Sequence, residues 1–137
     1  SGVEDGISHK NVNLVDLQEV EQFIAVVDCD ALAVGIGNAH GMYQGTPNLD
    51  FDRLAACRAL GTPPLVLHGG SGTPDDMIRK AIQLGIRKVN VATELRMAFM
   101  EGLEATVGQR DFYGMYRQAK TNMYELARKK IRLFQGK

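Results

Sequence analysis

Apolar residues recur along the chain with two spacings, one typical of helices and one typical of strands. Four segments have the spacing of an amphipathic helix, and three short apolar runs lie between them. The predicted helices are residues 16–27, 49–60, 74–84 and 93–105. The predicted strands are residues 31–37, 64–68 and 86–92, and their apolar runs are typical of strands buried on both faces.

Residues that favour helix ends support these boundaries. Thr73 is a predicted N-cap with Pro74 at the first helical position, and Gly61 and Gly85 are predicted to end the second and third helices. The first helix is expected to place Leu17, Val20, Phe23, Ile24 and Val27 on one face. The apolar positions of the third helix are Met77, Ile78, Ala81, Ile82 and Leu84.

The strict alternation of helices and strands predicts an α/β fold. Parallel strands need a crossover connection, and a helix between two strands supplies one. No linker, repeat or low-complexity segment interrupts the alternation. We therefore expect βαβ units around a parallel sheet.

The C-terminal part of the chain has a different character. Residues 106–119 are polar and aromatic, which predicts an irregular connection. Residues 121–134 predict a basic amphipathic helix that packs on its own domain or on a neighbour. The side chains expected to face inward are Met123, Leu126, Ile131 and Phe134.

Composition narrows the possible partners and the compartment. The 16 basic and 16 acidic residues give no net charge, which argues against a nucleic-acid or membrane surface as the main partner. No apolar run approaches the roughly 18 residues of a spanning helix. Cys29 and Cys57 lack metal-type spacing and are expected to be reduced, mostly buried thiols, which favours a cytoplasmic protein.

Two histidines follow successive predicted strands. His40 comes just after residues 31–37, and His68 ends residues 64–68. Because the carboxyl ends of parallel strands lie on the same surface, both imidazoles are expected there, where α/β proteins place their ligand sites. Neutral imidazoles suit Zn²⁺, although a structural role for both remains an equal alternative.

Glycine-rich and polar turns follow the last two strands. The turn Gly69, Gly70, Ser71 and Gly72 offers backbone N–H groups, a hydroxyl and a following helix N-terminus. These are the parts of an anion site, although such turns also serve only to reverse the chain. The last strand ends in Asn90-Val91-Ala92-Thr93, again at a helix start. The two turns together indicate a site for a phosphorylated ligand.

Four stretches of sequence extend this interpretation. They are GVEDG at residues 2–6, AVGIGNAHGMYQGTPNLDFDRL at 33–54, PLVLHGGSGTPDDMIRKAI at 64–82 and GIRKVNVATELRMAF at 85–99. Together they resemble the class II, zinc-dependent ketose-bisphosphate aldolases, and most of all the tagatose-1,6-bisphosphate aldolase branch. The likeness runs from Gly2 into the terminal helix.

The resemblance implies a role for each matching residue. His40 and His68 correspond to two of three zinc ligands, and Glu4 to a carboxylate that transfers a proton at the substrate carbon. The carbonyl groups around Gly41, Gly69 and Ser71 correspond to a site for a monovalent cation, Na⁺ or K⁺. The implied contacts with dihydroxyacetone phosphate are Gly41, Gly69, Gly70, Ser71, Asn90, Val91, Ala92 and Thr93.

The resemblance also implies a reaction. It is aldol cleavage of a ketose bisphosphate to dihydroxyacetone phosphate and glyceraldehyde 3-phosphate, with zinc as the Lewis acid at the ketone. Many fructose-bisphosphate members carry an acid at the place of Ala92, whereas alanine resembles the tagatose branch. We therefore expect tagatose 1,6-bisphosphate as the substrate, with fructose 1,6-bisphosphate as the alternative.

The implied fold is a (β/α)8 TIM barrel, and such barrels need about 200 residues or more. Residues 1–137 are expected to be the C-terminal half of one such domain: three strands, the end of a fourth, and a C-terminal helix. The upstream motif with a proton-donating Asp and the first zinc His is absent. His9 lies in a predicted polar loop without a flanking strand and is no substitute.

An incomplete barrel has physical consequences. Open strand edges and exposed core predict that the isolated chain self-associates and lacks turnover. The resemblance implies a homo-oligomer that binds sugar phosphates, with the aromatic residues 112–124 as a contact surface. A non-catalytic companion subunit that serves assembly is the alternative of another class, but retention of both His40 and His68 favours the aldolase.

Overall fold

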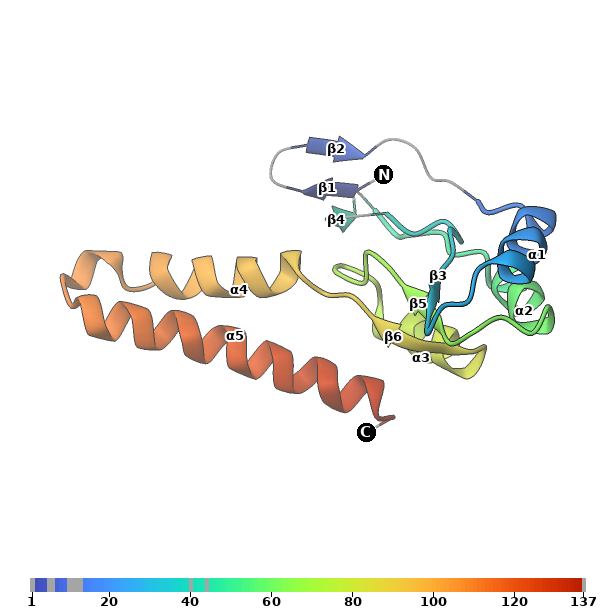
Figure 1. Cartoon of the computed structure of the whole chain (residues 1–137). Coiled ribbons are helices and arrows are strands. Elements are labelled where there is room, and N and C mark those ends of the chain that lie inside the picture. The colour runs from blue at the N-terminus through green and yellow to red at the C-terminus, as the bar shows by residue number, and fades with distance from the viewer. Residues whose placement is uncertain (1, 5–6, 10–13, 40, 44, 137) are drawn as a thin grey trace. The chain divides into compact units, whose positions relative to one another are not determined.

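The computed structural model describes residues 14–39, 41–43 and 45–136, together with the backbone of residues 2–4 and 7–9 (Figure 1). The chain divides into two compact units, Ser1–Val91 and Ala92–Lys137. The first unit holds the described strands, and the second is made of helices.

A parallel sheet is the centre of the first unit. Its strands are β3 (Leu32–Ala33), β5 (Leu65–Leu67) and β6 (Ile86–Val89), in the order β3-β5-β6. Helix α2 (Phe51–Ala59) connects β3 to β5, and α3 (Asp75–Gln83) connects β5 to β6. Both strand pairs are parallel, which confirms the predicted βαβ units.

The core of this unit is built on the central strand. All three residues of β5 are buried, as predicted for a strand with neighbours on both sides. The buried side chains of the flanking helices are Leu54 and Cys57 of α2, and Ile78 and Ala81 of α3. Burial raises the pKa of the Cys57 thiol, which keeps it protonated.

The two outer strands differ from the prediction. β3 comprises two residues rather than seven, and Ala33 is exposed, whereas Val34 and Ile36 beyond it are buried. In β6, Arg87 and Lys88 are exposed. Each of these strands has one neighbour in the described sheet, so the two-sided burial expected for them was wrong.

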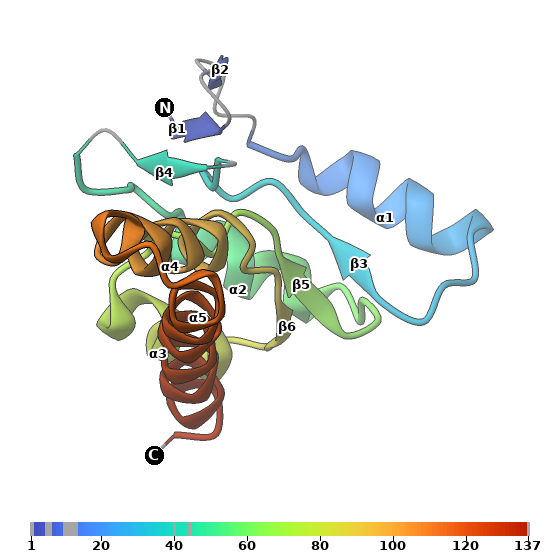
Figure 2. The same ribbon diagram turned by 90° about the vertical axis from the view of Figure 1, so that its left-hand side faces the viewer.

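An antiparallel sheet was not predicted. It pairs β1 (Gly2–Glu4) with β2 (Ile7–His9) on one side and with β4 (Met42–Tyr43) on the other. Figure 2 shows these three short strands together. The prediction of a loop around His9 was therefore wrong, because this residue pairs with Gly2. Strands of two or three residues leave no apolar alternation for a sequence pattern to detect.

Fewer residues of the first helix are buried than the spacing of its apolar residues predicts. Helix α1 (Leu17–Val26) begins at Asp16, whose carboxylate accepts the Gln18 N–H at 2.7 Å. Of the five positions predicted for its apolar face, Val20 is buried, whereas Phe23 is 42% and Val27 38% exposed. The inward placement of the last two was wrong.

The start of the third helix lies one residue later than predicted. Pro74 occupies the N-cap position instead of the first helical position. Thr73 does not cap the helix, since its hydroxyl donates to the Gly69 carbonyl at 3.5 Å. The predicted ends are confirmed, because Gly61 and Gly85 follow the C-cap residues with positive φ.

The second unit is a helical hairpin. Helix α4 (Thr93–Glu104) and helix α5 (Phe112–Phe134) are joined through the short 3₁₀ helix η1 (Val107–Gln109), and they lie side by side in Figure 1. A Cβ atom on Gly102 would lie 2.5 Å from the Ala119 Cα, so the two backbones approach closely at this glycine.

The predicted irregular connection is mostly helix. Residues 112–119 are the first two turns of α5, which begins where Asp111 accepts the Gly114 N–H at 3.0 Å. Phe112 stacks on Tyr116 one turn later, with ring centroids 6.1 Å apart. This N-cap and the aromatic pair support helix in a segment whose composition suggested a loop.

The buried stripe of α5 also differs from the prediction. Met123 and Ile131 are 37% and 55% exposed, although both were expected to face inward. The buried residues are Ala119, Lys130 and Leu133. The predicted stripe was displaced because a lysine occupies an inward position, where its ammonium pairs with Glu94 of α4 at 2.7 Å.

Cys29 and Cys57 are both free, as predicted, but Cys29 is only half-buried and lies in a loop. Within the described residues, every helix is too short or too polar to cross a membrane.

Candidate functional site

His68 follows the last residue of the central strand β5 and is half-buried. Its backbone carbonyl accepts a hydrogen bond from the Asn38 side-chain amide at 3.0 Å. Asn38 is itself held, because its side-chain oxygen accepts the Ile36 N–H at 3.0 Å. The sheet and the segment after β3 therefore fix the main chain at His68.

A chain of side-chain contacts orients the His68 ring. Lys88 Nζ lies 2.6 Å from Asn90 Oδ1, and Asn90 Nδ2 lies 3.2 Å from His68 Nδ1. The Asn90 side chain therefore contacts both the Lys88 ammonium and the His68 ring, and it holds the imidazole in place.

The turn after His68 is packed against the end of β6. The Gly70 N–H donates to the Asn90 carbonyl at 2.9 Å. A Cβ atom on Gly70 would lie 2.5 Å from Val89 Cγ1 and 2.9 Å from the Asn90 carbonyl oxygen, so no larger residue fits without movement. The turn and the strand end, predicted separately as anion-binding elements, are therefore in direct contact.

This contact refines the predicted role of Gly70. Its N–H is used inside the protein, so Gly70 allows close approach of the two backbones and does not offer that N–H group to a ligand. Gly69 and Gly72 have φ of 63° and 73°, and Ser71 is 3% exposed.

Two residues that hold this turn were not predicted. The Tyr43 hydroxyl accepts the Ala39 N–H at 3.0 Å and donates to the Gly69 carbonyl at 3.3 Å. Asn38 holds the neighbouring carbonyl of His68. The motif NAHGMY contains both residues, but only the folded chain shows which carbonyl groups their side chains contact.

The other predicted site residues lie in different parts of the chain. Gly41 is buried with φ of 83°, directly before β4. His40 and the Glu4 side chain lie outside the described residues. Ala92 and Thr93 belong to the second unit, where Ala92 is the N-cap residue of α4 and Thr93 its first residue.

His68 is the one predicted metal ligand whose side chain the structure describes. In the described part of the chain, no group of three or more His, Cys, Asp or Glu side chains could hold a metal ion. An imidazole is a side chain that zinc accepts as a ligand, but His68 Nδ1 is already in contact with Asn90, and a complete ligand set needs residues beyond those described.

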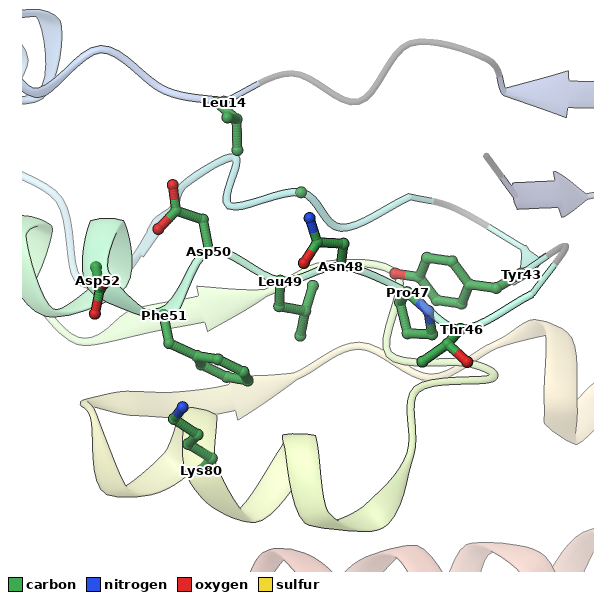
Figure 3. A pocket seen from close by; sticks show the side chains of 11 residues that line it. Leu14, Tyr43, Thr46, Pro47, Asn48, Leu49, Asp50, Phe51, Asp52 and Lys80 are labelled. Atoms are coloured by element: carbon green, nitrogen blue, oxygen red, sulfur yellow. The ribbon is translucent and has the colours of Figure 1, made fainter.

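A cavity of about 640 Å³ lies in the first unit, and Figure 3 shows its lining side chains. Asp50 and Asp52 at the start of α2, Lys80 of α3 and the Tyr43 ring contribute to its wall. Of the nine predicted site residues whose side chains or backbone lie in the described part of the chain, leaving aside Glu4 and His40, none lines this cavity. The hydrogen bonds from Arg53 hold the pKa of the Asp50 carboxyl below its ordinary value, so Asp50 is ionised near neutral pH.

Solved structures share this fold. The YdjI aldolase from Escherichia coli K12 is 38% identical, with a TM-score of 0.78 over 88% of this chain and 44% of that chain. A structure from Coccidioides immitis is 25% identical, with a TM-score of 0.85 over 98% and 48%. The fructose-bisphosphate aldolase from Campylobacter jejuni, at 18% identity, has a TM-score of 0.71 over 93% and 49%, which shows the fold alone.

The chain therefore spans about half the length of these proteins. All 137 residues match the family described as class-II fructose-bisphosphate aldolase. With the histidine at the end of the central strand and the glycine turn packed on the next one, this match shows that the chain belongs to the class II ketose-bisphosphate aldolase family.

Proposed function

We propose that this chain is the C-terminal half of a class II aldolase barrel and that it carries part of the zinc site and the phosphate site. The reaction proposed for the whole protein is reversible cleavage of tagatose 1,6-bisphosphate to dihydroxyacetone phosphate and glyceraldehyde 3-phosphate. The observation that carries the proposal is that Asn90 contacts both His68 and Gly70. This residue thereby links the histidine proposed as a metal ligand to the glycine-rich turn proposed to bind phosphate.

The proposed metal ligands are His40 and His68, with further ligands from residues outside this chain. When bound, zinc would supply Lewis acidity at the substrate ketone. The chain's own contribution is to orient the imidazole, and the contact from Asn90 to His68 Nδ1 supports that role. A monovalent cation, Na⁺ or K⁺, is proposed at the carbonyl groups of Gly41, Gly69 and Ser71.

The turn Gly69–Gly70–Ser71 is proposed to contact the substrate phosphate, and the packing of Gly70 on Asn90 and Val91 supports a fixed shape for this turn. A Cβ atom on Gly70 would also lie 3.4 Å from Val91 Cγ2, which supports this packing role. The resemblance also implies phosphate contacts for Ala92 and Thr93, which lie at the N-terminus of α4, where the partial positive charge of a helix favours an anion.

Glu4 is proposed to exchange a proton at the substrate carbon, as the resemblance implies. Ala92 supports tagatose over fructose. Many fructose-bisphosphate members carry an acid at this place, which can hydrogen-bond a sugar hydroxyl, whereas the alanine side chain cannot. The two sugars differ at one hydroxyl stereocentre, so modest differences in contact energy set the preference. Fructose 1,6-bisphosphate is the alternative substrate.

We also propose a cytoplasmic homo-oligomer, with the aromatic residues 112–124 at a contact between copies. The exposure of Phe112, Tyr113 and Tyr124, at 69%, 78% and 64%, supports this surface. A companion subunit that serves only assembly is the second candidate. The oriented imidazole of His68 favours the aldolase, because assembly has no need of a metal ligand.

The test is cleavage of both sugar bisphosphates by this chain, with added Zn²⁺ and with a chelator. Chelator-sensitive cleavage supports the aldolase, and the ratio of rates identifies the sugar. The isolated chain is expected to be inactive and to gain activity when the missing half of the barrel is co-expressed. If the complemented protein stays inactive with zinc and both sugars, the catalytic proposal is wrong. If it cleaves only fructose 1,6-bisphosphate, the assignment of the sugar is wrong.

A further inference from the structure

The backbone of Asn90 is held on both sides. Its N–H donates to the Leu67 carbonyl at 3.0 Å, and its carbonyl accepts the Gly70 N–H at 2.9 Å. The end of β6 is thereby tied to the end of β5 and to the turn that follows β5. A change of conformation at Asn90 is therefore confined to its side chain, which turns about its two χ angles.

Both ends of the Asn90 side-chain amide contact neighbouring side chains. Its Oδ1 lies 2.6 Å from Lys88 Nζ, and its Nδ2 lies 3.2 Å from His68 Nδ1. An ammonium group has only N–H donors, so the contact with Lys88 needs the amide oxygen. While the oxygen faces Lys88, the NH₂ group is the end of the amide that faces the His68 ring.

Metal binding through either ring nitrogen of His68 conflicts with this position of the amide. A metal ion at Nδ1 needs the lone pair of that atom, so the Asn90 NH₂ group has to move away. A metal ion at Nε2 leaves the proton of the neutral imidazole on Nδ1, and a ligating histidine donates that proton to an acceptor. An NH₂ group is no acceptor, so the amide has to turn and present the oxygen that Lys88 holds.

We infer that metal binding at His68 is coupled to a turn of the Asn90 side chain, which gives up its present contact with His68 Nδ1, with Lys88 or with both. The inference rests on the proposed function, in which His68 is a zinc ligand. Before the metal ion binds, the same amide holds the imidazole in place. The family resemblance implies that Asn90 also contacts dihydroxyacetone phosphate, so one side chain connects the metal ion to the substrate site.

The test is a titration of the full chain with Zn²⁺, followed by NMR. The ¹⁵N shifts of the two His68 ring nitrogens report which of them binds the metal ion. The ¹H–¹⁵N signals of the Asn90 side-chain NH₂ group report the position of the amide. Both sets of signals are expected to change with the same zinc Kd, and a chelator is expected to reverse both changes.

Lys88→Met removes the ammonium group that holds the amide oxygen of Asn90. Since the amide then turns without losing this hydrogen bond, the zinc Kd measured at His68 is expected to fall about fivefold. Lys88→Arg keeps a positive charge and N–H donors at the same position. The zinc Kd of this variant is expected to stay close to that of the unmodified chain.

Arg87→Met separates the contact from the effect of charge, because Lys88→Met also removes a positive charge near the metal ion. Arg87 is the preceding residue of β6 and is likewise exposed. Its guanidinium donates to the Ile82 and Ile86 carbonyl groups, at 2.9 and 3.0 Å. Because salt screens exposed charges, Arg87→Met is expected to lower the zinc Kd by less than about twofold.

The outcomes distinguish this inference from the function on which it rests. If Zn²⁺ moves no ring signal of His68 in the unmodified chain, the proposed ligand role fails and the inference fails with it. If the ring signals move and the Asn90 side-chain signals do not, only the inference fails. An equal fall in Kd for Arg87→Met and Lys88→Met overturns the role of the Lys88 contact. Should Lys88→Met not fold, the Asn90 signals of the unmodified chain still decide the inference.

Discussion

Asp50 shows how one residue organises the start of a helix. Its carboxylate accepts the Arg53 N–H at 2.8 Å and pairs with the Arg53 guanidinium at 3.1 Å. Arg53 also donates to the Val15 carbonyl, and the Asp50 N–H donates to the Ile36 carbonyl at 2.8 Å. The N-cap of α2 is thus linked to the segments before α1 and after β3.

This arrangement predicts an acid dependence of stability. The pKa of Asp50 is lowered in the folded chain, so its contribution is complete above the unfolded pKa of about 3.9. This contribution to stability is lost as the pH falls through the lower pKa that Asp50 has in the folded chain. Asp50→Asn keeps a good N-cap and removes the charge. We expect a lower thermal midpoint near neutral pH and a gap from the unmodified chain that closes below about pH 4.

Asp52→Asn is the matched control, because Asp52 is an exposed acid in the same first turn. Its effect on the thermal midpoint should be smaller than that of Asp50→Asn near neutral pH, since α2 is capped by Asp50. Equal pH profiles for the two variants would show that the Asp50–Arg53 contact contributes nothing specific.

The helical hairpin depends on an ion pair between its two elements. Lys130 of α5 and Glu94 of α4 are 2.7 Å apart, with side chains 11% and 14% exposed. Glu94 is in the first turn of α4, next to Ala92 and Thr93. The pair therefore ties the C-terminal part of the chain to the helix start that the proposed function uses.

Removing one partner is predicted to be costly. Lys130→Met leaves the Glu94 carboxylate without this cation in a mostly buried place, and we expect a loss of about 3 kcal/mol in the free energy of unfolding. Urea denaturation measures it. The double variant Glu94→Gln, Lys130→Met should recover part of the loss, because no uncompensated charge remains.

The neighbouring Lys129 is exposed, so Lys129→Met serves as the control and should change stability by less than about 0.5 kcal/mol. If Lys130→Met is equally mild, the pair does not hold the hairpin together.

The whole chain presents unpaired strand edges. β3 and β6 each have one neighbour in the described sheet, and an uncovered edge offers N–H and carbonyl groups to another chain. Large apolar side chains are also exposed on the hairpin, Tyr113 and Phe112 among them. Both features favour association of copies of this chain.

We therefore predict that the isolated chain self-associates at micromolar concentration in sedimentation velocity. Ala33→Lys places a charge on the β3 edge, at an exposed residue, and is expected to shift the distribution toward smaller species. Ala105→Lys adds the same charge after α4, at another exposed residue, and should not. A monodisperse monomer of the unmodified chain would contradict the prediction.

Several elements have local signals strong enough to be predicted from the residues alone. The spacing of apolar residues predicted α2, α3, α4 and the buried strand β5, because helix and strand periods differ clearly over segments of that kind. The motifs around His68 and Asn90 indicated a family that the match over all 137 residues confirms. Motifs report chemistry directly, since they depend on residue type at fixed spacing.

Other features depend on contacts between residues that are distant along the chain, and these contacts form only when the chain folds. The strands β1, β2 and β4 are too short to carry a pattern, and they exist through their pairing. Lys130 is buried because Glu94 lies opposite it, although the sequence alone predicts that a lysine at that position faces solvent. Gly70 and Tyr43 have their roles through the Asn90 and Gly69 carbonyl groups, which are 20 and 26 residues away along the chain. Local spacing cannot specify which backbone groups meet when the chain closes on itself.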